Sequence, residues 1–324
     1  MTRYIIIGAG AVGASLAAEF ESHGLDYVLV GRGEQIAHIA AQGLTYRRPG
    51  GTRVLALKTA DQSSPPALKP GDVLLLTVKT QDVETTSQDW AWLDIPGGGL
   101  AATLPIVTFQ NGLAAEEIVL RRFDSVHAAS ILIPARYTRT GEVTVASTPH
   151  VGVVTLGRFP HGVDEITHAI VTDLNRAGYL AEARADIRRW KAAKLIHNVG
   201  NALELFSDPP EVHAKTAEAL AAEAHSILQA ASHDPADPSE RGVDLSSWRI
   251  AEITGDEAGG KSTWQSFVRG TSSEVDYLNG EIVRLARLHG LAAPFNAAVQ
   301  AAAATLARDG AAPGTRPLNL ALPA

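Results

Sequence analysis

The chain contains no cysteine among its 324 residues. This absence excludes disulfide bonds, thiolate metal sites and a cysteine nucleophile. Lysine and arginine number 28 against 35 aspartates and glutamates, which gives a net charge of −7. Proteins hold phosphate backbones and anionic lipid surfaces with clustered positive charge, so we expect neither a nucleic-acid partner nor a membrane partner.

Long apolar runs and an export signal are also missing. No apolar stretch reaches the roughly 18 residues of a membrane helix, and no basic leader with a cleavage site precedes the first apolar run. We therefore expect a cytoplasmic location. The 11 histidines are scattered without an HExxH motif or another ligand spacing, so we expect no metal.

The rest of the composition is that of an ordinary globular protein. The chain is longer than a typical single domain, so we expect two domains with separate cores. Runs of β-branched residues disappear near Ala183, and alanine, leucine and glutamate at helical spacing dominate from there to about Arg308. We place the domain boundary at this change. Residues 1–183 are predicted to form an α/β domain with a doubly wound sheet, and residues 184–324 an all-helical domain.

A glycine-rich turn follows the first apolar run, Tyr4 to Ile7. It reads Gly8-Ala9-Gly10-Ala11-Val12-Gly13, and a helix-like segment and a second strand come after it, Ala14 to Ser22 and Tyr27 to Val30. In such a GxGxxG turn the glycines allow a tight turn, close approach of a pyrophosphate and close helix–strand packing. The phosphate then meets the helix N-terminus. This context favours dinucleotide binding over a merely glycine-rich turn.

The end of the second strand bears on which nucleotide is bound. An NAD site usually has an acidic residue there for the ribose 2′-hydroxyl, whereas this chain has Gly31-Arg32-Gly33, and arginine suits a 2′-phosphate. We therefore expect NADP(H). The alternative is a solvated Arg32, with Glu34 binding the ribose.

Two further apolar segments, residues 72–78 and 104–109, are typical of strands buried on both faces of a parallel sheet. Lys79 follows the first, and Gln110-Asn111-Gly112 follows the second. Ligands bind outside the carboxyl ends of such strands, so Lys79 and Asn111 are candidates to touch a cofactor or substrate. Either could instead serve only in a turn, since Asn-Gly is a common turn pair.

Polar residues lie within an apolar frame between Arg189 and Leu203. One face of the expected helix carries Trp190, Lys194, Asn198 and Asn201. The opposite face carries Leu195, Ile196, Val199 and Leu203. A lysine among amides is suited to hold and protonate a polarised oxygen. The alternative is a solvated stripe on an amphipathic helix.

A second group of polar residues runs from Lys261-Ser262 to Asn279-Gly280. Within it, Thr271-x-x-Glu274 matches a capping box, in which the glutamate would bond the backbone N–H of Thr271. The residues by themselves leave both a capping role and a functional role open for Glu274.

Together these motifs resemble those of the ketopantoate reductase (2-dehydropantoate 2-reductase) family, in order and over nearly the whole chain. They are the glycine turn, Val78-Lys79, Gln110-Asn111-Gly112, Trp190…Lys194…Asn198, Ser262 and Glu274-x-Asp276-Tyr277-x-Asn279-Gly280. The resemblance implies an N-terminal Rossmann domain, a C-terminal helical domain like that of 6-phosphogluconate dehydrogenase-like proteins, and a substrate cleft between them.

The resemblance also implies roles. Lys194 would be the general acid, and Glu274 would bind a substrate hydroxyl. Substrate contacts are expected from Asn198, Asn201 and Ser262, and contacts on the nicotinamide side from Lys79 and Asn111. The implied reaction is the NADPH-dependent reduction of 2-dehydropantoate, or of a related 2-oxo acid, in pantothenate biosynthesis. A homodimer is kept among the expectations.

The chain departs from the family pattern at two places. Asn201 follows Asn198 by three residues where the family commonly has four, and Gly259-Gly260 replaces an asparagine often found before the serine. Both changes concern substrate contacts, so they bear on the identity of the 2-oxo acid more than on the reaction.

Two alternative functions are kept. A 3-hydroxy-acid dehydrogenase of the 6-phosphogluconate type would need a Ser-Gly-Gly segment between the domains, which is absent, and would leave the Glu274 segment unexplained. A non-catalytic NADP(H)-binding regulator is the other, and the retention of both Lys194 and Glu274 argues against it.

Overall fold

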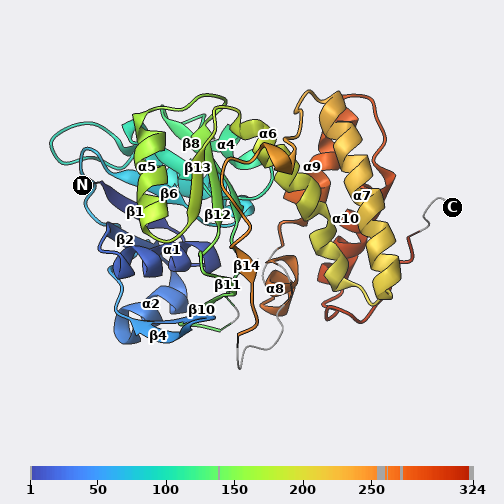
Figure 1. Ribbon diagram of the computed structural model, residues 1–324, viewed down its shortest axis with the longest axis horizontal. Helices are drawn as coiled ribbons and strands as arrows, with labels where there is room; N and C mark the ends of the chain where they lie inside the picture. The colour runs from blue at the N-terminus through green and yellow to red at the C-terminus, as the bar shows by residue number, and fades with distance from the viewer. Residues whose placement is uncertain (1, 138, 254–259, 261, 271–272, 321–324) are drawn as a thin grey trace. The chain divides into compact units, whose positions relative to one another are not determined.

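The computed structural model describes residues 2–137, 139–253, 260, 262–270 and 273–320 (Figure 1). The chain divides into two compact units. Unit 1 comprises Met1–Gln110, Ala115–Ile187 and Arg241–Asp256, and unit 2 comprises Asn111–Ala114, Arg188–Glu240 and Glu257–Ala324. The boundary predicted after residue 183 lies close to Ile187, but the return of Arg241–Asp256 to unit 1 was not expected.

Unit 1 is built on an eight-stranded sheet with the order β13-β12-β8-β7-β6-β1-β2-β5. The strands are β1 (Arg3–Ile7), β2 (Asp26–Gly31), β5 (Thr59–Asp61), β6 (Val73–Leu76), β7 (Ile106–Thr108), β8 (Val126–Leu132), β12 (Val153–Arg158) and β13 (Leu180–Ala183). Every neighbouring pair is parallel except β12 with β8. The carboxyl ends of β1, β2, β6 and β7 therefore lie at one edge, where sheets of this kind bind ligands.

The central strands are covered on both faces by helices. The helices are α1 (Ala11–Ser22), α2 (Gly33–Gln42), α3 (Val83–Ala91), α4 (Ala114–Val119) and α5 (Glu165–Arg176), with 3₁₀ turns η1 (Thr80–Asp82) and η2 (Ala101–Thr103). In β1, Tyr4 and Ile6 join the core that contains α1 and α5, whereas Ile5 and Ile7 join the core that contains α3 and α4. Successive strand side chains point to opposite faces, which is why an unbroken apolar run suits a sheet covered on both sides.

Two smaller sheets complete unit 1. The first has the order β4-β3-β10-β9 and packs on α1. Its strands are β3 (Leu44–Arg48), β4 (Gly51–Leu55), β9 (Ala135–Arg136) and β10 (Glu142–Val145). The second pairs β11 (Ser147–Thr148) with β14 (Arg249–Ile250). The all-helical pattern expected beyond Ala183 is therefore wrong at β14, because this strand depends on pairing with a distant segment and not on local periodicity.

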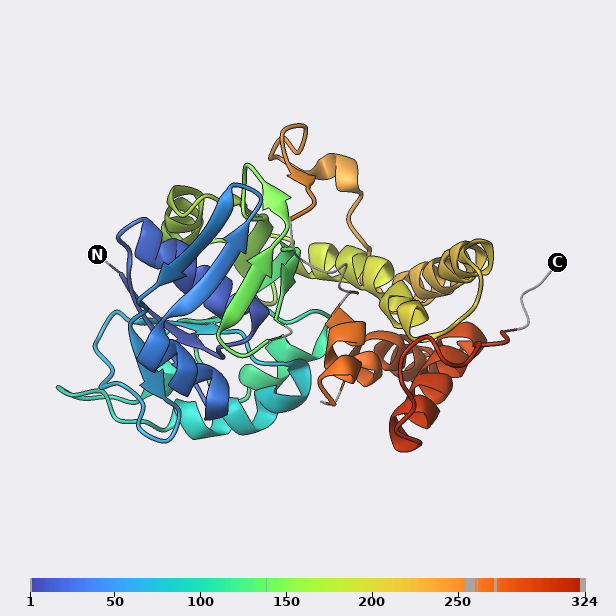
Figure 2. The ribbon, with the colours of Figure 1, turned by 90° about the horizontal axis from the view of Figure 1, so that it is seen from below.

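Unit 2 is helical. Its elements are α6 (Ile187–Asn198), η3 (Val199–Leu205), α7 (Pro210–Ala230), η4 (Pro238–Glu240), α8 (Ser262–Val268), α9 (Val275–Leu288) and α10 (Pro294–Arg308). Figures 1 and 2 show α7, α9 and α10 side by side, and they share one apolar core. Fully buried Asn296 links these helices: its Oδ1 accepts from Asn279 Nδ2 at 3.0 Å, and its Nδ2 donates to Glu223 at 2.8 Å.

The structure confirms the predicted fold class, an α/β unit with a mostly parallel sheet and a helical unit. It adds β13, α2 and α3, which the sequence pattern did not predict. No helix in the described part of the chain is long and apolar enough to cross a membrane.

Candidate functional site

Two glycines of the turn between β1 and α1 are held in contacts that leave no room for a side chain. Gly8 has a φ of +120°, and a Cβ there would lie 2.8 Å from the Val78 backbone nitrogen. A Cβ on Gly13 would lie 1.9 Å from the Gly8 carbonyl oxygen. Glycine at these positions therefore allows the tight turn and the close approach of α1 to it.

Gly10 differs because it faces open space. Apart from its chain neighbours, no described atom lies within 4 Å of a Cβ placed on it. It occupies the N-cap position of α1, and no side chain caps that helix in the described structure. The first N–H groups of a helix without a capping side chain suit an anion, as does the positive end of the helix dipole. This cradle fits the pyrophosphate of a dinucleotide.

Thr77 holds the glycine turn from the neighbouring strand. Its hydroxyl lies 2.9 Å from the Gly8 carbonyl oxygen and 3.1 Å from that of Ile7. No motif in the sequence points to this residue. The only available signal was a hydroxyl at the end of an otherwise apolar strand, a weak one because threonine is common in strands.

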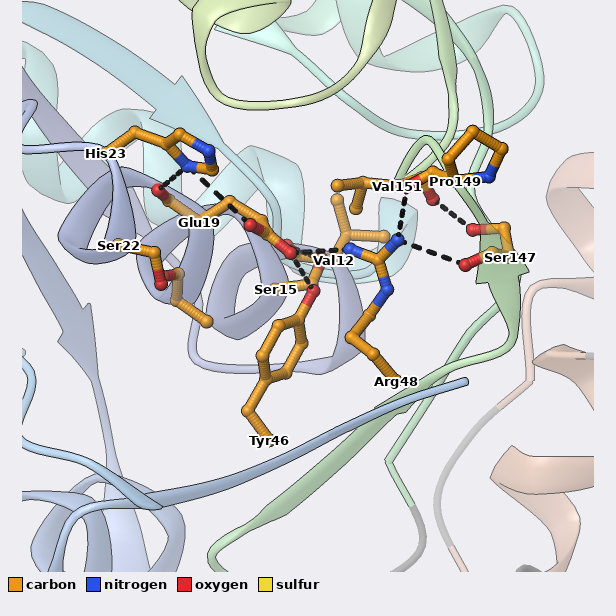
Figure 3. Close-up of polar contacts among 11 residues, drawn as sticks. Val12, Ser15, Glu19, Ser22, His23, Tyr46, Arg48, Ser147, Pro149 and Val151 are labelled. Carbon is orange, nitrogen blue, oxygen red and sulfur yellow. Dashed lines mark hydrogen bonds and ion pairs between the residues drawn. The ribbon is translucent and has the colours of Figure 1, made fainter. Parts of the chain in front are cut away.

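The C-terminal half of α1 is anchored by the buried carboxylate of Glu19 (Figure 3). Its Oε1 accepts hydrogen bonds from the Tyr46 hydroxyl and from Arg48 Nη1, both at 2.7 Å. Arg48 Nη2 also donates to the carbonyl oxygens of Ser147 and Pro149. Burial, and then the nearby negative charge of Glu19, raise the pKa of Tyr46 well above its ordinary value, so its hydroxyl stays a donor. The helix whose N-terminus faces the predicted phosphate is thus fixed to β3 and to the segment after β10.

Arg32 lies directly after β2, at the N-cap of α2, with its side chain 72% exposed. Its Nη2 lies 3.4 Å from Oδ1 of Asp82, the last residue of η1. Glu34, the residue of the alternative interpretation, is exposed in the first turn of α2. Arg32 therefore stands where the acid of an NAD site is usually found, and it has a carboxylate partner in this structure.

Lys79 and Asn111 follow the neighbouring strands β6 and β7. Lys79 is the N-cap of η1, and Gln110 Nε2 ties the two strand ends together by donating to the carbonyl oxygens of Leu76 and Val78 at 2.9 Å. Asn111 itself belongs to unit 2.

The Asn111-Gly112 turn lies against the first turn of α9. Gly112 has a φ of +82°, and a Cβ there would lie 2.6 Å from the Tyr277 carbonyl oxygen. The positive φ is what the turn interpretation of Asn-Gly predicts. The close approach places the Asn111-Gly112 turn beside the start of α9, the helix that follows Glu274.

Lys194 and Asn198 lie one turn apart on α6, which ends at Asn198 and continues as the 3₁₀ helix η3. Residues three apart eclipse in a 3₁₀ helix, so Asn201, at a spacing of three, stays on the same side as Asn198. Asn198 and Asn201 are 3% and 6% exposed, and Lys194 is half-buried. The alternative prediction, a solvent-exposed polar stripe, is therefore wrong for Asn198 and Asn201, because both side chains are buried.

The opposite side of α6 and η3 packs as predicted. Leu195, Val199 and Leu203 are buried in the core of unit 2, and Ile196 packs against it. On the polar side, Asn198 Nδ2 is buried and has no hydrogen-bond partner among the described residues. The face thus combines an ammonium with a buried amide donor that lacks an acceptor.

Three residues of the motif that opens α9 have structural contacts. Asp276 accepts from Gln300 Nε2 at 2.7 Å, and Asn279 Nδ2 donates to the Val199 carbonyl oxygen at 2.9 Å. A Cβ on Gly280 would lie 2.8 Å from Gln300 Nε2. These contacts hold α9 against η3 and α10, which gives a packing reason for their place in the motif.

Glu274 is the N-cap residue of α9, is 6% exposed, and its side chain makes no capping hydrogen bond. Thr271, its partner in the expected capping box, lies outside the described residues. In a capping box the glutamate is the third residue of the helix, whereas Glu274 precedes the first residue of α9. The structure therefore gives no support to a capping box at the start of α9.

Ser262 is the first residue of α8, and Gly260 comes shortly before it. A Cβ on Gly260 would lie 2.7 Å from Glu204 Oε2 and 2.6 Å from the Trp264 side chain. The Gly260 carbonyl oxygen accepts from Gln265 Nε2 at 3.0 Å. The close contact with η3 explains glycine at 260, while Gly259 lies outside the described residues.

The predicted residues thus fall into two groups. Unit 1 holds Gly8, Ala9, Gly10, Ala11, Val12, Gly13, Arg32 and Lys79, and unit 2 holds Asn111, Lys194, Asn198, Asn201, Ser262 and Glu274. The first group carries the dinucleotide features and the second, apart from Asn111, the substrate features. Within the described residues, no cluster of three or more His, Asp and Glu side chains could hold a metal ion.

Two family models cover most of the chain. Ketopantoate reductase PanE/ApbA matches residues 4–161, and Ketopantoate reductase PanE/ApbA C terminal matches residues 186–307. The chain belongs to the ketopantoate reductase family. The resemblance seen in the motifs is thereby confirmed, and membership places the chain among oxidoreductases that act on a CH–OH group.

Individual members agree with this assignment. The 2-dehydropantoate 2-reductase of Pyrococcus horikoshii is 27% identical over 303 residues, which cover 90% of this chain and 93% of that protein. The crystal structure of a PanE/ApbA family ketopantoate reductase from Ralstonia eutropha JMP134 has a TM-score of 0.76 at 22% identity, and covers 95% of this chain and 99% of its own. A ternary structure of D-mandelate dehydrogenase with NADH and anilino(oxo)acetate has a TM-score of 0.75 at 18% identity, with the same coverage. At these identities the two structures speak for the fold alone.

Proposed function

We propose that this ketopantoate reductase family member reduces the 2-oxo group of 2-dehydropantoate, or of a related 2-oxo acid, with NADPH. The observation that carries the proposal is the buried Asn198 Nδ2, which lacks a described partner one helical turn from Lys194. A buried donor without an acceptor costs about 1–3 kcal/mol. An oxygen of a bound substrate would remove this cost and lie within reach of an ammonium.

The nucleotide is assigned to the residues of unit 1. The glycine turn and the N-terminus of α1 would hold the pyrophosphate, and Arg32 the 2′-phosphate. Lys79 would border the nicotinamide. Bound NADPH supplies the hydride that reaches C2 of the substrate.

The substrate is assigned to the residues of unit 2. Lys194 would donate a hydrogen bond to the C2 oxygen, transfer its proton as negative charge develops there, and regain a proton from solvent. Its positive charge also attracts the substrate carboxylate. Asn198, Asn201 and Ser262 would hold the polar groups of the 2-oxo acid, and Glu274 would accept from a hydroxyl. One hydride at carbon and one proton at oxygen give the 2-hydroxy acid.

The test is an NADPH-oxidation screen over 2-oxo acids that includes 2-dehydropantoate. We expect turnover with at least one of them. Tight NADPH binding without turnover of any 2-oxo acid would instead favour the non-catalytic regulator. Family membership leaves the 6-phosphogluconate-type alternative without support.

A second candidate is NADH-dependent reduction of a 2-oxo acid. One observation favours it: Arg32 is paired with Asp82 in this structure. The same screen run with NADH separates the two candidates, because the reductant that gives the higher kcat/KM is the preferred one.

A further inference from the structure

The carboxylate of Asp82 lies at the edge of the sheet where the nucleotide is expected. In the sheet order β6-β1-β2, the strands that precede Asp82 and Arg32 flank β1 and run parallel to it. Residues that follow β2 and β6 therefore lie on either side of the glycine turn after β1. This topology brings Arg32 Nη2 and Asp82 Oδ1 to 3.4 Å although the residues are 50 positions apart.

The carboxylate of Asp82 makes its contact outside its own helix. Asp82 is the last residue of η1 and directly precedes α3, and its helical backbone differs from the extended conformation in which an aspartate normally caps a helix. In this structure its side chain makes no capping hydrogen bond, and its described side-chain contact is with Arg32. The carboxylate therefore contributes to the charge around Arg32 and not to the start of α3.

We propose that Asp82 is a specificity-determining residue that weakens the preference of this protein for NADPH over NADH by pairing with Arg32. The inference rests on the proposed function, in which Arg32 meets the 2′-phosphate. NADPH must compete with Asp82 for the guanidinium, and its phosphate dianion then lies near a carboxylate of the same sign. NADH carries no 2′-phosphate, so the Arg32–Asp82 pair persists when NADH binds.

The size of the effect follows from exposure. The side chains of Arg32 and Asp82 are 72% and 40% exposed, and exposed ion pairs are weak. We therefore expect Asp82 to tune the choice of nucleotide by about two- to tenfold and not to abolish either binding mode. Because solvent-exposed charges are screened by salt, the effect should shrink as ionic strength rises.

The experiment measures the Kd of NADPH and of NADH by calorimetry, without substrate, for the wild type, Asp82→Asn, Arg32→Ala and a control. The control is Asp89→Asn, which removes an exposed carboxylate from near the C-terminal end of the same helix, α3. We expect Asp82→Asn to lower the NADPH Kd by about two- to tenfold. Its NADH Kd and both Kd values of the control should stay near wild type.

The variants separate failure of the inference from failure of the proposed function. If Arg32→Ala weakens NADPH selectively but Asp82→Asn leaves the NADPH-to-NADH ratio unchanged, Arg32 keeps its assignment and the role of Asp82 is refuted. An Arg32→Ala variant with wild-type affinity for both nucleotides would refute the 2′-phosphate assignment itself. An equal gain for both nucleotides in Asp82→Asn would show a general charge effect and also overturn the inference.

Discussion

Lys194 lies half-buried on α6, one turn before an asparagine whose amide nitrogen is buried without a described partner. Hydride addition to a ketone leaves negative charge on oxygen, and a positioned acid typically contributes about 10²–10⁴-fold to the rate. We predict that Lys194→Ala lowers kcat by at least about 10²-fold and leaves the NADPH Kd nearly unchanged. Steady-state kinetics and nucleotide titration measure the two quantities.

The matched control for this prediction is Lys215→Ala, which removes an exposed lysine from α7. It should keep the wild-type kcat, since its ammonium lies on the solvated surface. If Lys194→Ala kept most of its kcat on the best substrate, the proton donor would have to be another group.

Glu274 is a buried carboxylate at the start of α9 that makes no capping hydrogen bond. If it binds a substrate hydroxyl, Glu274→Gln should lower kcat/KM while the melting temperature stays nearly the same, because the substitution keeps the side-chain volume. Kinetics and thermal melting of the same preparation test this. Wild-type kinetics in the glutamine variant would return Glu274 to a structural role.

A control for Glu274→Gln lies two residues further on. Asp276 is exposed and accepts from Gln300 Nε2 at 2.7 Å, and an asparagine oxygen could also accept that bond. Asp276→Asn should therefore leave kcat/KM near wild type. This result would show that removing a negative charge from the start of α9 does not by itself impair the enzyme.

Among the elements, helix α1 has the proposed nucleotide site at its N-terminus and a buried ion pair near its C-terminus. Glu19→Leu would leave Arg48 and the Tyr46 hydroxyl without their carboxylate, so we predict a loss of about 3 kcal/mol in the free energy of unfolding. Tyr46→Phe removes one hydrogen bond and should cost less, about 1–2 kcal/mol. Denaturant unfolding of the nucleotide-free protein measures both, and equal losses would contradict the ion-pair explanation.

The junction of α6 with η3 explains one departure from the family pattern. An unbroken α-helix would rotate Asn201 away from Asn198 by about 60°, since each residue turns the helix by about 100°. The change to 3₁₀ geometry after Asn198 brings the two back to the same side at a spacing of three. The altered spacing in the sequence is therefore matched by an altered helix type, with Val199 held by Asn279 of α9 at the point of change.

At the scale of the whole molecule, binding of a nucleotide to the native state should raise its stability by mass action, by about 2.7 kcal/mol at a hundredfold excess over Kd. Gly10→Ala tests where the nucleotide binds. An added Cβ would point into open space and the backbone is not in the left-handed region, so the nucleotide-free melting temperature should change little. The same Cβ would stand where the pyrophosphate approaches, so the increase in melting temperature with NADPH should be largely lost.

Gly50→Ala is the control, because Gly50 also faces open space with an ordinary φ but lies in the β3–β4 turn. It should keep both its melting temperature and the increase with NADPH. A Gly10→Ala variant with the full increase would place the nucleotide elsewhere.

The homodimer and the cytoplasmic location expected from the sequence remain predictions.

Local sequence patterns determined many of the strands, turns and helix faces of this protein. Apolar runs after short polar breaks are enough for β1, β2, β6 and β7, because strands buried on both faces need apolar residues at every position. The order strand, Gly8–Gly13, helix predicts the tight turn before α1, since only glycine fits where a Cβ would lie 1.9 Å from a carbonyl oxygen. The polar and apolar faces around Lys194 follow from helical periodicity in the same way.

Contacts between residues far apart in the chain were established only by the tertiary structure. β14 exists because it pairs with β11, about 100 residues away, and a two-residue strand leaves no periodicity to detect. Arg32 and Asp82 meet only because the sheet order places β2 and β6 on either side of β1. The predicted capping box of Thr271 and Glu274 could not be judged until the first residue of α9 was known. The β11–β14 pair and the Arg32–Asp82 pair join segments far apart in the chain that carry no local signal of their contact, so only the folded chain brings them together.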